Sequence, residues 1–192
     1  MQERVRGPVI AVIGGSQAGP DDTAAAYAVG RELALRGATV VCGGLGGIME
    51  AVCRGAKSAG GQTIGILPGF IAESANPYVD IAIVTGMGYA RNTIVVLSAQ
   101  AVIAIAGSFG TLSEIGVARG HNIPVVGLHT WQVFSRDPLE IPYLLAYSPL
   151  EAVDLALEAA GAAPSRRVPA AAEPWSGDGR SLDGEDAAVR PD

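Results

Sequence analysis

The chain has 192 residues and is poor in cysteine, aromatic residues and lysine. Its two cysteines, Cys42 and Cys53, are too few for a disulfide framework, and no second cysteine pair or nearby histidine gives zinc-site spacing. We therefore expect two buried thiols and no metal site. Aromatic residues make up 5% of the chain, so a core has to be formed mainly by Val, Ile, Leu and Ala.

Basic residues are scarce as well. Thirteen lysines and arginines face nineteen acidic residues, which leaves a net charge of -6, and Lys57 is the only lysine. This balance argues against the broad electrostatic contact that nucleic-acid binding requires, so we expect no nucleic-acid partner. A small anionic ligand remains compatible with it, because oriented backbone amides bind an anion locally.

The sequence also lacks a long apolar run. The longest, residues 93–107, contains Ser98 and Gln100 and is shorter than the roughly 20 residues that span a bilayer. The N-terminal apolar run reaches Gly14 too soon for a signal peptide and has the pattern of a strand. We expect no membrane partner and a cytoplasmic location.

Glycine, in contrast, is abundant: the chain contains 26, about twice the average share. Short runs rich in Val and Ile alternate with segments of helical period, and glycine marks each change. This pattern predicts an α/β fold, a single domain with a mainly parallel sheet of about six or seven strands and helices on both faces. The strands placed by sequence are 8–13, 38–42, 62–67, 80–85, 101–106 and 124–128, with helices at 22–36, 47–59, 90–100, 112–120 and 150–160.

The composition changes after residue 160. Residues 161–192 are rich in Pro, Ala and Gly and hold six acidic residues and four arginines, without apolar periodicity. We predict a ligand-binding domain over residues 1–160 and a disordered acidic tail over residues 161–192.

Three glycine clusters fall where a predicted strand ends and a helix begins. In a parallel sheet such junctions lie on one edge, where ligands bind, and their free N–H groups at helix starts suit a phosphate. Each cluster alone could be a tight turn; three on one edge favour a binding site. Neither G-x-G-x-x-G nor the P-loop pattern is matched, which argues against P-loop ATP hydrolysis. The predicted ligand- or phosphate-binding residues are Gly14, Gly15 and Ser16 in the first cluster, Gly43, Gly44, Gly46 and Gly47 in the second, Gly107, Ser108, Phe109, Gly110 and Thr111 in the third, and Asn92.

Two charged residues stand near these clusters. Arg91, followed by Asn92, comes after the fourth strand and hence on the same edge, where its guanidinium could pair with a phosphate or with Glu114. An ordinary surface arginine is the alternative. Thr111 to Glu114 also has the pattern of a capping box, and on the residues alone this interpretation of Glu114 is favoured.

Four ordered motifs over residues 8–160 resemble the Lonely Guy (LOG) and molybdenum cofactor carrier superfamily. They are residues 41–51, residues 64–69, Arg91-Asn92 and residues 107–114. Members have been labelled "possible lysine decarboxylase", and a DprA/Smf-related label is used for the branch that this chain resembles. The resemblance implies a Rossmann-like sheet and a homodimer.

The resemblance also implies roles for individual residues. In the LOG enzymes a P-G-G-x-G-T-x-x-E motif binds the phosphate of a nucleoside 5'-monophosphate, and an arginine and the motif's glutamate carry out hydrolysis of the N-glycosidic bond. Carried over, Gly107, Gly110 and Thr111 match the phosphate loop, and Arg91 and Glu114 match the catalytic pair.

Two departures from the enzyme pattern bear on activity. The chain has Ala106-Gly107-Ser108 where the enzymes have P-G-G, and Asn92 where they usually have lysine. Arg-Asn and G-T-L-S-E patterns are usual in the carrier branch. The departures therefore favour ligand binding over catalysis.

These observations leave three hypotheses of function. The leading one is a protein that binds a phosphate-bearing nucleotide or a pterin-type cofactor, such as the molybdenum cofactor. The alternative is a phosphoribohydrolase that releases the base of a nucleoside 5'-monophosphate, with Glu114 stabilising positive charge on the ribose and Arg91 fixing the phosphoribosyl group. A purely structural protein would leave three aligned glycine clusters unexplained. Lysine decarboxylation finds no support, because Lys57 is predicted on a helix away from the ligand edge.

Overall fold

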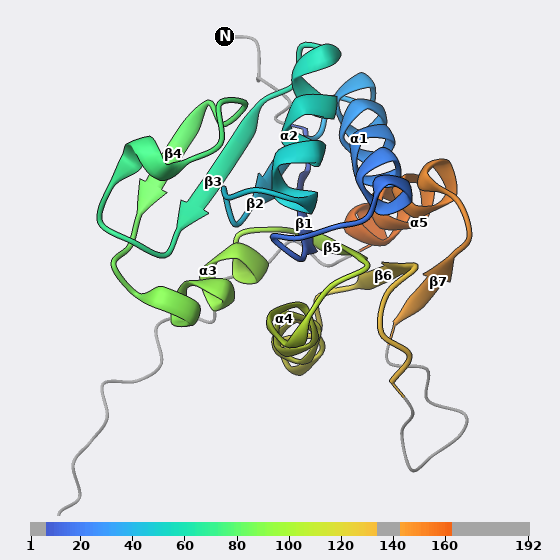
Figure 1. Ribbon diagram of the computed structural model, residues 1–192. Coiled ribbons are helices and arrows are strands. Elements are labelled where there is room, and N and C mark those ends of the chain that lie inside the picture. The colour runs from blue at the N-terminus through green and yellow to red at the C-terminus, as the bar shows by residue number, and fades with distance from the viewer. Residues whose placement is uncertain (1–6, 134–142, 163–192) are drawn as a thin grey trace, which may run out of the picture.

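The computed structural model describes residues 7–133 and 143–162 (Figure 1). Its strands are β1 (Val9–Gly14), β2 (Thr39–Cys42), β3 (Thr63–Leu67), β4 (Ile81–Val84), β5 (Ala101–Ile105), β6 (Val125–Leu128) and β7 (Leu144–Ala146). The α-helices are α1 (Pro20–Leu35), α2 (Ile48–Ser58), α3 (Asn92–Leu97), α4 (Phe109–Gly120) and α5 (Pro149–Ala162), and short 3₁₀ turns are η1 (Ala72–Ser74) and η2 (Gly88–Arg91).

All seven strands form one parallel sheet in the order β4-β3-β2-β1-β5-β6-β7. The strand order reverses between β1 and β5, where Gly14 pairs with Ile105. Such a reversal opens a crevice at the carboxyl ends of the two strands, the place where α/β sheets bind ligands. The predicted parallel α/β fold is confirmed, and it is Rossmann-like.

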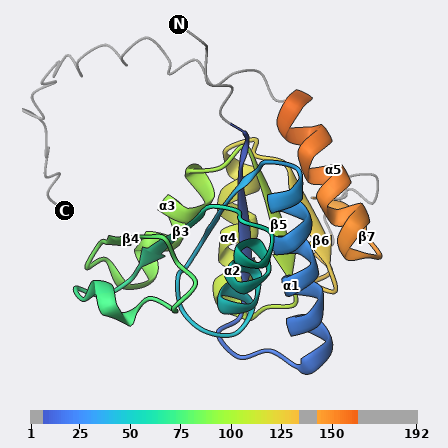
Figure 2. The same cartoon turned by 90° about the horizontal axis from the view of Figure 1, so that it is seen from above.

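Helices cover both faces of the sheet (Figures 1 and 2). One core cluster joins α1, α2 and α5 to side chains such as Ile10 and Ile103, and the other joins α3 and α4 to the opposite face through residues such as Ile13 and Val102. Seen from above, α1 and α2 lie side by side, with α5 next to α1 (Figure 2). Strands buried on both faces explain the continuous apolar runs of the sequence.

Glycines allow the close approach of α1 and α2. A Cβ on Gly30 would overlap the carbonyl oxygen of Val52, and a Cβ on Gly55 would overlap that of Tyr27. The two helix backbones are therefore in direct contact, and both positions require glycine for packing rather than for ligand binding.

Several predicted boundaries were wrong for physical reasons. The helix expected at 90–100 is reduced to α3, because Gln100 accepts a hydrogen bond from Val9 N–H (2.6 Å) and thereby belongs to the turn into β5. Helix α4 begins at Phe109 instead of residue 112, because positive φ angles at Ala106 (47°) and Gly107 (113°) reverse the chain directly after β5. Strand β7 was not placed by sequence, since three residues carry no periodicity.

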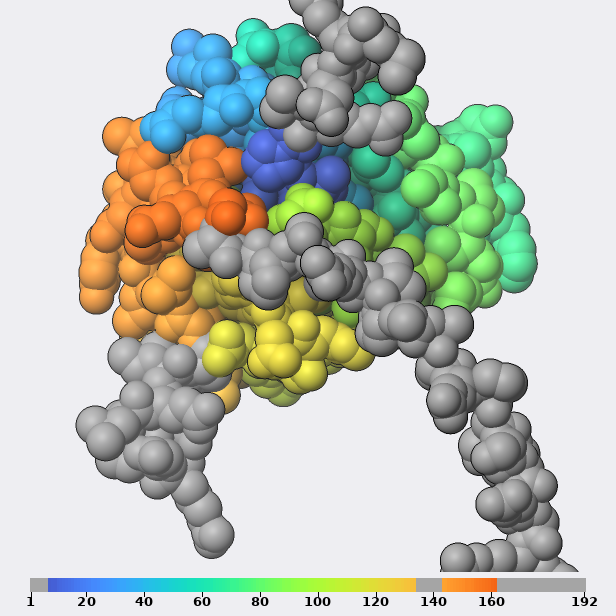
Figure 3. All heavy atoms as spheres, turned by 180° about the vertical axis from the view of Figure 1, so that it is seen from behind, coloured from blue at the N-terminus to red at the C-terminus, as the bar shows by residue number. Residues whose placement is uncertain are grey.

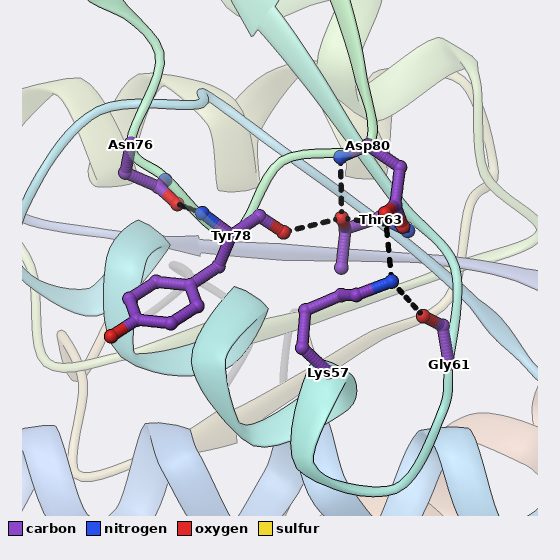
Figure 4. A network of polar contacts seen from close by, with 6 residues as sticks. All are labelled: Lys57, Gly61, Thr63, Asn76, Tyr78 and Asp80. Carbon is purple, nitrogen blue, oxygen red and sulfur yellow. Dashed lines mark hydrogen bonds and ion pairs between the residues drawn. The ribbon is translucent and has the colours of Figure 1, made fainter.

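The amino ends of the strands form the edge opposite the glycine clusters, and the start of β1 reaches the surface there beside α5 (Figure 3). Lys57 lies at this edge: its Nζ donates to Gly61 O (3.1 Å) and pairs with Asp80 Oδ1 (2.7 Å) (Figure 4). The lysine is thus engaged in joining α2 to the start of β4. The tail expected over residues 161–192 lies outside the described residues, apart from Gly161 and Ala162, which end α5.

Within the described ranges, no helix is long and apolar enough to cross a membrane.

Candidate functional site

A cavity of about 340 Å³ opens at the carboxyl edge of the sheet, where β1 and β5 diverge. Segments after five strands, β1 to β5, contribute to its wall, as expected where the strand order reverses. The lining residues are Ile13, Gly14, Gly15, Ser16, Gly43, Leu45, Met49, Pro68, Gly88, Tyr89, Arg91, Asn92, Ser108, Gly110, Thr111 and Glu114. Its volume suits a small molecule of nucleotide size.

The structure brings most of the predicted site residues to this wall, but not all. Gly44 packs under Leu67, and Gly47 packs against Gly15 and Ser16, both with positive φ angles, so they shape the loops without lining the cavity. Gly46 and Gly107 do not line it either, and the Phe109 side chain points outward, 78% exposed, against Trp131.

The loop after β5 presents backbone N–H groups without acceptors. In the described part of the chain, the N–H groups of residues 107–111 donate no hydrogen bond to the protein, whereas Ala106 N–H donates to Leu128 O (3.2 Å) and Leu112 N–H to Ser108 O (3.0 Å). These groups lie at the start of the twelve-residue helix α4, so the helix dipole adds partial positive charge. The loop has the donors that an anion needs.

The capping-box interpretation of Glu114 is wrong. Because α4 begins at Phe109, its N-cap is Ser108, and Thr111 and Glu114 lie inside the helix. Glu114 is instead buried, 6% exposed, with its side chain in the cavity wall.

Arg91 is not a surface arginine. It is 7% exposed, and its Nε has no hydrogen-bond partner among the described residues. Its guanidinium occupies the space beside Gly43, where a Cβ would overlap Nη1. Burial lowers the pKa of Arg91, and the nearby Glu114 opposes this shift. A buried cation with an unused donor is costly unless a ligand completes its hydrogen bonds.

The pKa of Glu114 is raised above its usual value. Burial raises the pKa of its carboxyl to about 7, while Arg91 counteracts part of the increase. The two groups form no contact ion pair in the described residues, but both line the cavity and each influences the pKa of the other. A carboxyl that titrates near neutral pH in a cavity is suited to both hydrogen-bond donation and general base chemistry.

The cavity wall combines polar and apolar groups. Arg91, Asn92 and the residues after β5 contribute polar groups, and Leu45, Met49, Pro68 and Tyr89 add apolar and aromatic surface. Sequence reasoning missed these four, because Leu45 and Pro68 are single loop residues, Tyr89 lies in η2 and Met49 in the first turn of α2, where no periodic signal marks a cavity.

Sequence reasoning also missed Asn76. This buried side chain donates from Nδ2 to Gly44 O (3.2 Å) and Leu45 O (3.0 Å), and its backbone N–H donates to Gly44 O (2.9 Å). Asn76 thus fixes the glycine cluster after β2, residues 43–47, from a loop about thirty residues further along the chain. An asparagine before proline in a loop is the only signal the sequence offered.

The two cysteines are buried free thiols, as predicted, with Cys42 Sγ and Cys53 Sγ 3.5 Å apart. Cys42 Sγ also accepts from Gly44 N–H at 3.4 Å, so the thiols pack beneath the second glycine cluster. Over residues 7–133 and 143–162, no group of three or more His, Cys, Asp or Glu side chains could hold a metal ion.

Comparisons with known proteins identify the family of the chain. The model of the SLOG cluster4 family matches residues 7–147. An uncharacterized protein of Archaeoglobus fulgidus is 39% identical over 145 residues, which cover 72% of this chain and 95% of that protein. The cytokinin riboside 5'-monophosphate phosphoribohydrolase of Mycobacterium tuberculosis is 34% identical over 116 residues, 55% of this chain and 62% of that enzyme.

Solved structures of similar proteins indicate the same superfamily. The molybdenum cofactor binding protein of Rippkaea orientalis is 41% identical with a TM-score of 0.73, and the match covers 79% of this chain and 96% of that one. The molybdenum cofactor carrier protein of Chlamydomonas reinhardtii is 31% identical with a TM-score of 0.72, over 81% and 99% of the two chains. DNA processing protein A of Helicobacter pylori, at 20% identity and a TM-score of 0.58 over 79% and 80%, shares the fold alone. The chain belongs to the SLOG cluster4 family, within the LOG and molybdenum cofactor carrier superfamily that its motifs predicted.

Proposed function

We propose that the chain binds a small ligand with a phosphate group and a flat ring system, a nucleotide or a pterin-type cofactor, in the cavity beside Arg91. The observation that carries this proposal is the meeting of two sets of unused donors at one cavity: the backbone amides of the loop after β5, of which Ser108, Gly110 and Thr111 line the cavity, and the buried Arg91 Nε. Free amides occur at the start of any helix, but free amides and a buried guanidinium on one cavity match an anion. The similarity to molybdenum cofactor binding and carrier proteins supports the same conclusion.

The two kinds of lining residue suit the two parts of such a ligand. The amides and Arg91 hold the phosphate, and apolar and aromatic residues such as Leu45, Pro68 and Tyr89 accept the ring. A nucleoside monophosphate and the phosphate-bearing pterin of a molybdenum cofactor both have this division. The pterin cofactor would be cargo here, held through its own phosphate and ring.

Thermal unfolding with matched ligands tests the proposal. At about 100 times its Kd, AMP is expected to raise the Tm by roughly 5–10 °C. Ribose 5-phosphate, which lacks the ring, is expected to give a smaller rise, and adenosine, which lacks the phosphate, almost none. Molybdopterin prepared without oxygen serves as the pterin arm. Absence of stabilisation by every phosphate compound would overturn the proposal.

Hydrolysis is a second candidate function, favoured by one observation: Glu114 has a pKa of about 7 and lines the same cavity as Arg91. Its ionised carboxylate would stabilise positive charge on the ribose and orient water, which would convert AMP and water into adenine and ribose 5-phosphate. Chromatography of AMP and N6-substituted AMP after incubation detects the free base. If the chain binds AMP but releases no free base, its function is to carry or sense the ligand.

We also propose that the chain forms a homodimer through the β4 side of the sheet. Edge strand β4 exposes Ile81 and Ile83 by 44% and 43%, and Phe70 and Met87 nearby are 84% and 50% exposed. An unpaired edge strand with exposed apolar side chains favours association. Light scattering is expected to give twice the mass of one chain; a monomer at every concentration would contradict this.

A further inference from the structure

The loop that presents the free amides is held in an unfavourable backbone conformation. Ala106 has a φ of 47° and Gly107 one of 113°, and His129, on the neighbouring segment after β6, has a φ of 52°. Residues with a Cβ rarely adopt positive φ, and they retain it only where surrounding contacts enforce it. The contacts that enforce it here are therefore informative.

These contacts come from the segment directly after β6. Thr130 Oγ1 donates to Ala106 O, and Trp131 Nε1 donates to Ser108 O at 3.1 Å. The Trp131 ring also packs on Phe109, with ring centroids 5.4 Å apart and planes inclined by 39°. The backbone carbonyls of Ala106 and Ser108, the residues on either side of Gly107, thus accept hydrogen bonds from two side chains that do not line the cavity.

Holding these carbonyls determines where the amides point. In a planar trans peptide the C=O and the following N–H point in opposite directions. With the Ala106 carbonyl turned to Thr130, the Gly107 N–H points away from Thr130. The Ser108 carbonyl accepts from both Trp131 Nε1 and Leu112 N–H (3.0 Å), so the Phe109 N–H points away from both donors. Neither N–H has an acceptor in the described residues, and Gly107 and Phe109 flank Ser108, which lines the cavity.

We infer that Thr130 and Trp131 are positioning residues that preorganise the amides of residues 107–111 for an anion. The inference rests on the proposed phosphate binding and extends it to two residues that do not line the cavity. An anion site formed in advance loses less free energy to loop ordering when the ligand binds. Without the two side-chain donors, the positive φ angles have less to maintain them, and the amides are free to turn away.

The test compares Thr130→Val with Thr130→Ser by calorimetric titration with AMP, ribose 5-phosphate and inorganic phosphate. Valine keeps the shape of threonine but lacks the donor, and it is expected to weaken all three ligands by about ten-fold. Serine keeps the hydroxyl and is expected to restore binding. If the Kd values of AMP and ribose 5-phosphate rise by the same factor, the substitution affects only the contacts to the phosphate group, which both ligands share.

Thr63→Val is the matched control. Thr63 Oγ1 donates to Tyr78 O at 2.7 Å in the network at the opposite edge of the sheet, so the substitution removes the same kind of bond (Figure 4). It is expected to lower the Tm and leave the Kd of each ligand unchanged. Trp131→Phe, which keeps an aromatic ring against Phe109 and loses the donor, gives an independent variant if Thr130→Val does not fold.

The outcomes separate this inference from the proposed function. Tight AMP binding by the original chain with unchanged Kd values in Thr130→Val and Trp131→Phe would overturn the positioning role and leave the proposed function intact. Absence of AMP, ribose 5-phosphate and phosphate binding by the original chain would overturn both. Loss of affinity in Thr63→Val equal to that in Thr130→Val would show that binding follows stability alone, and this also overturns the positioning role.

Discussion

Arg91→Ala is expected to weaken AMP binding by about 100-fold. Arg91 is 7% exposed, its Nε has no partner in the described residues, and it lines the same cavity as Ser108, Gly110 and Thr111. A charge-assisted bond between a phosphate and a buried guanidinium is much stronger than a surface contact. Calorimetric titration of the variant with AMP measures the loss directly.

The control for Arg91→Ala is Arg119→Ala. Arg119 lies in the last turn of α4 and is exposed, so its substitution removes the same charge from the protein without changing the cavity. We expect its Kd for AMP to stay within about two-fold of that of the original chain, because rim and surface charges contribute little at moderate salt. Similar losses in the two variants would indicate that only net charge matters and would contradict the assignment of Arg91.

Glu114→Gln is expected to change how the stability of the protein depends on pH. The pKa of Glu114 is raised by burial from 4.5 to about 7, so the folded state binds its proton more tightly than the unfolded state. This contribution to stability is fully present below pH 4.5 and is lost as the pH rises through 7. The shift corresponds to about 3 kcal/mol, of which about 2 kcal/mol falls between pH 5.5 and 8.5.

Glutamine cannot ionise, so the variant should lack this pH-dependent loss. Urea unfolding at pH 5.5 and 8.5 is expected to show that Glu114→Gln gains about 2 kcal/mol relative to the original chain on going to the higher pH. Glu158→Gln on α5, where the side chain is exposed, should keep the original profile. If Glu114→Gln and the original chain lose stability in parallel, the carboxyl is not held protonated by burial.

Much of the fold could be predicted from the sequence because the central strands are covered on both faces. Residues 10–13 are all buried, and this produces a continuous apolar run that marks a parallel strand. The same sheet topology predicted that the glycine clusters share one edge. Strand β7 escaped prediction because three residues, two of them exposed, leave no pattern.

The acidity of Glu114 could not be predicted, because it depends on where α4 begins. Local pattern favoured a capping box, but the positive φ angles of Ala106 and Gly107 start the helix three residues earlier than expected and turn Glu114 into the cavity wall. Those angles are in turn held by Thr130 and Trp131, which follow a different strand. Contacts between segments distant in the chain decide the site's chemistry, and a single sequence does not reveal them.

The most direct test of anion binding at the loop after β5 is an amide NMR titration of the ¹⁵N-labelled chain with AMP. We expect the largest shift changes at the backbone amides of residues 107–111, because these N–H groups gain an acceptor, and we expect inorganic phosphate to move the same signals. A change is also expected at Arg91 Nε–H, which has no partner in the described part of the chain without ligand. Saturable binding of AMP that leaves the amides of residues 107–111 and Arg91 Nε–H unchanged would contradict the central claim.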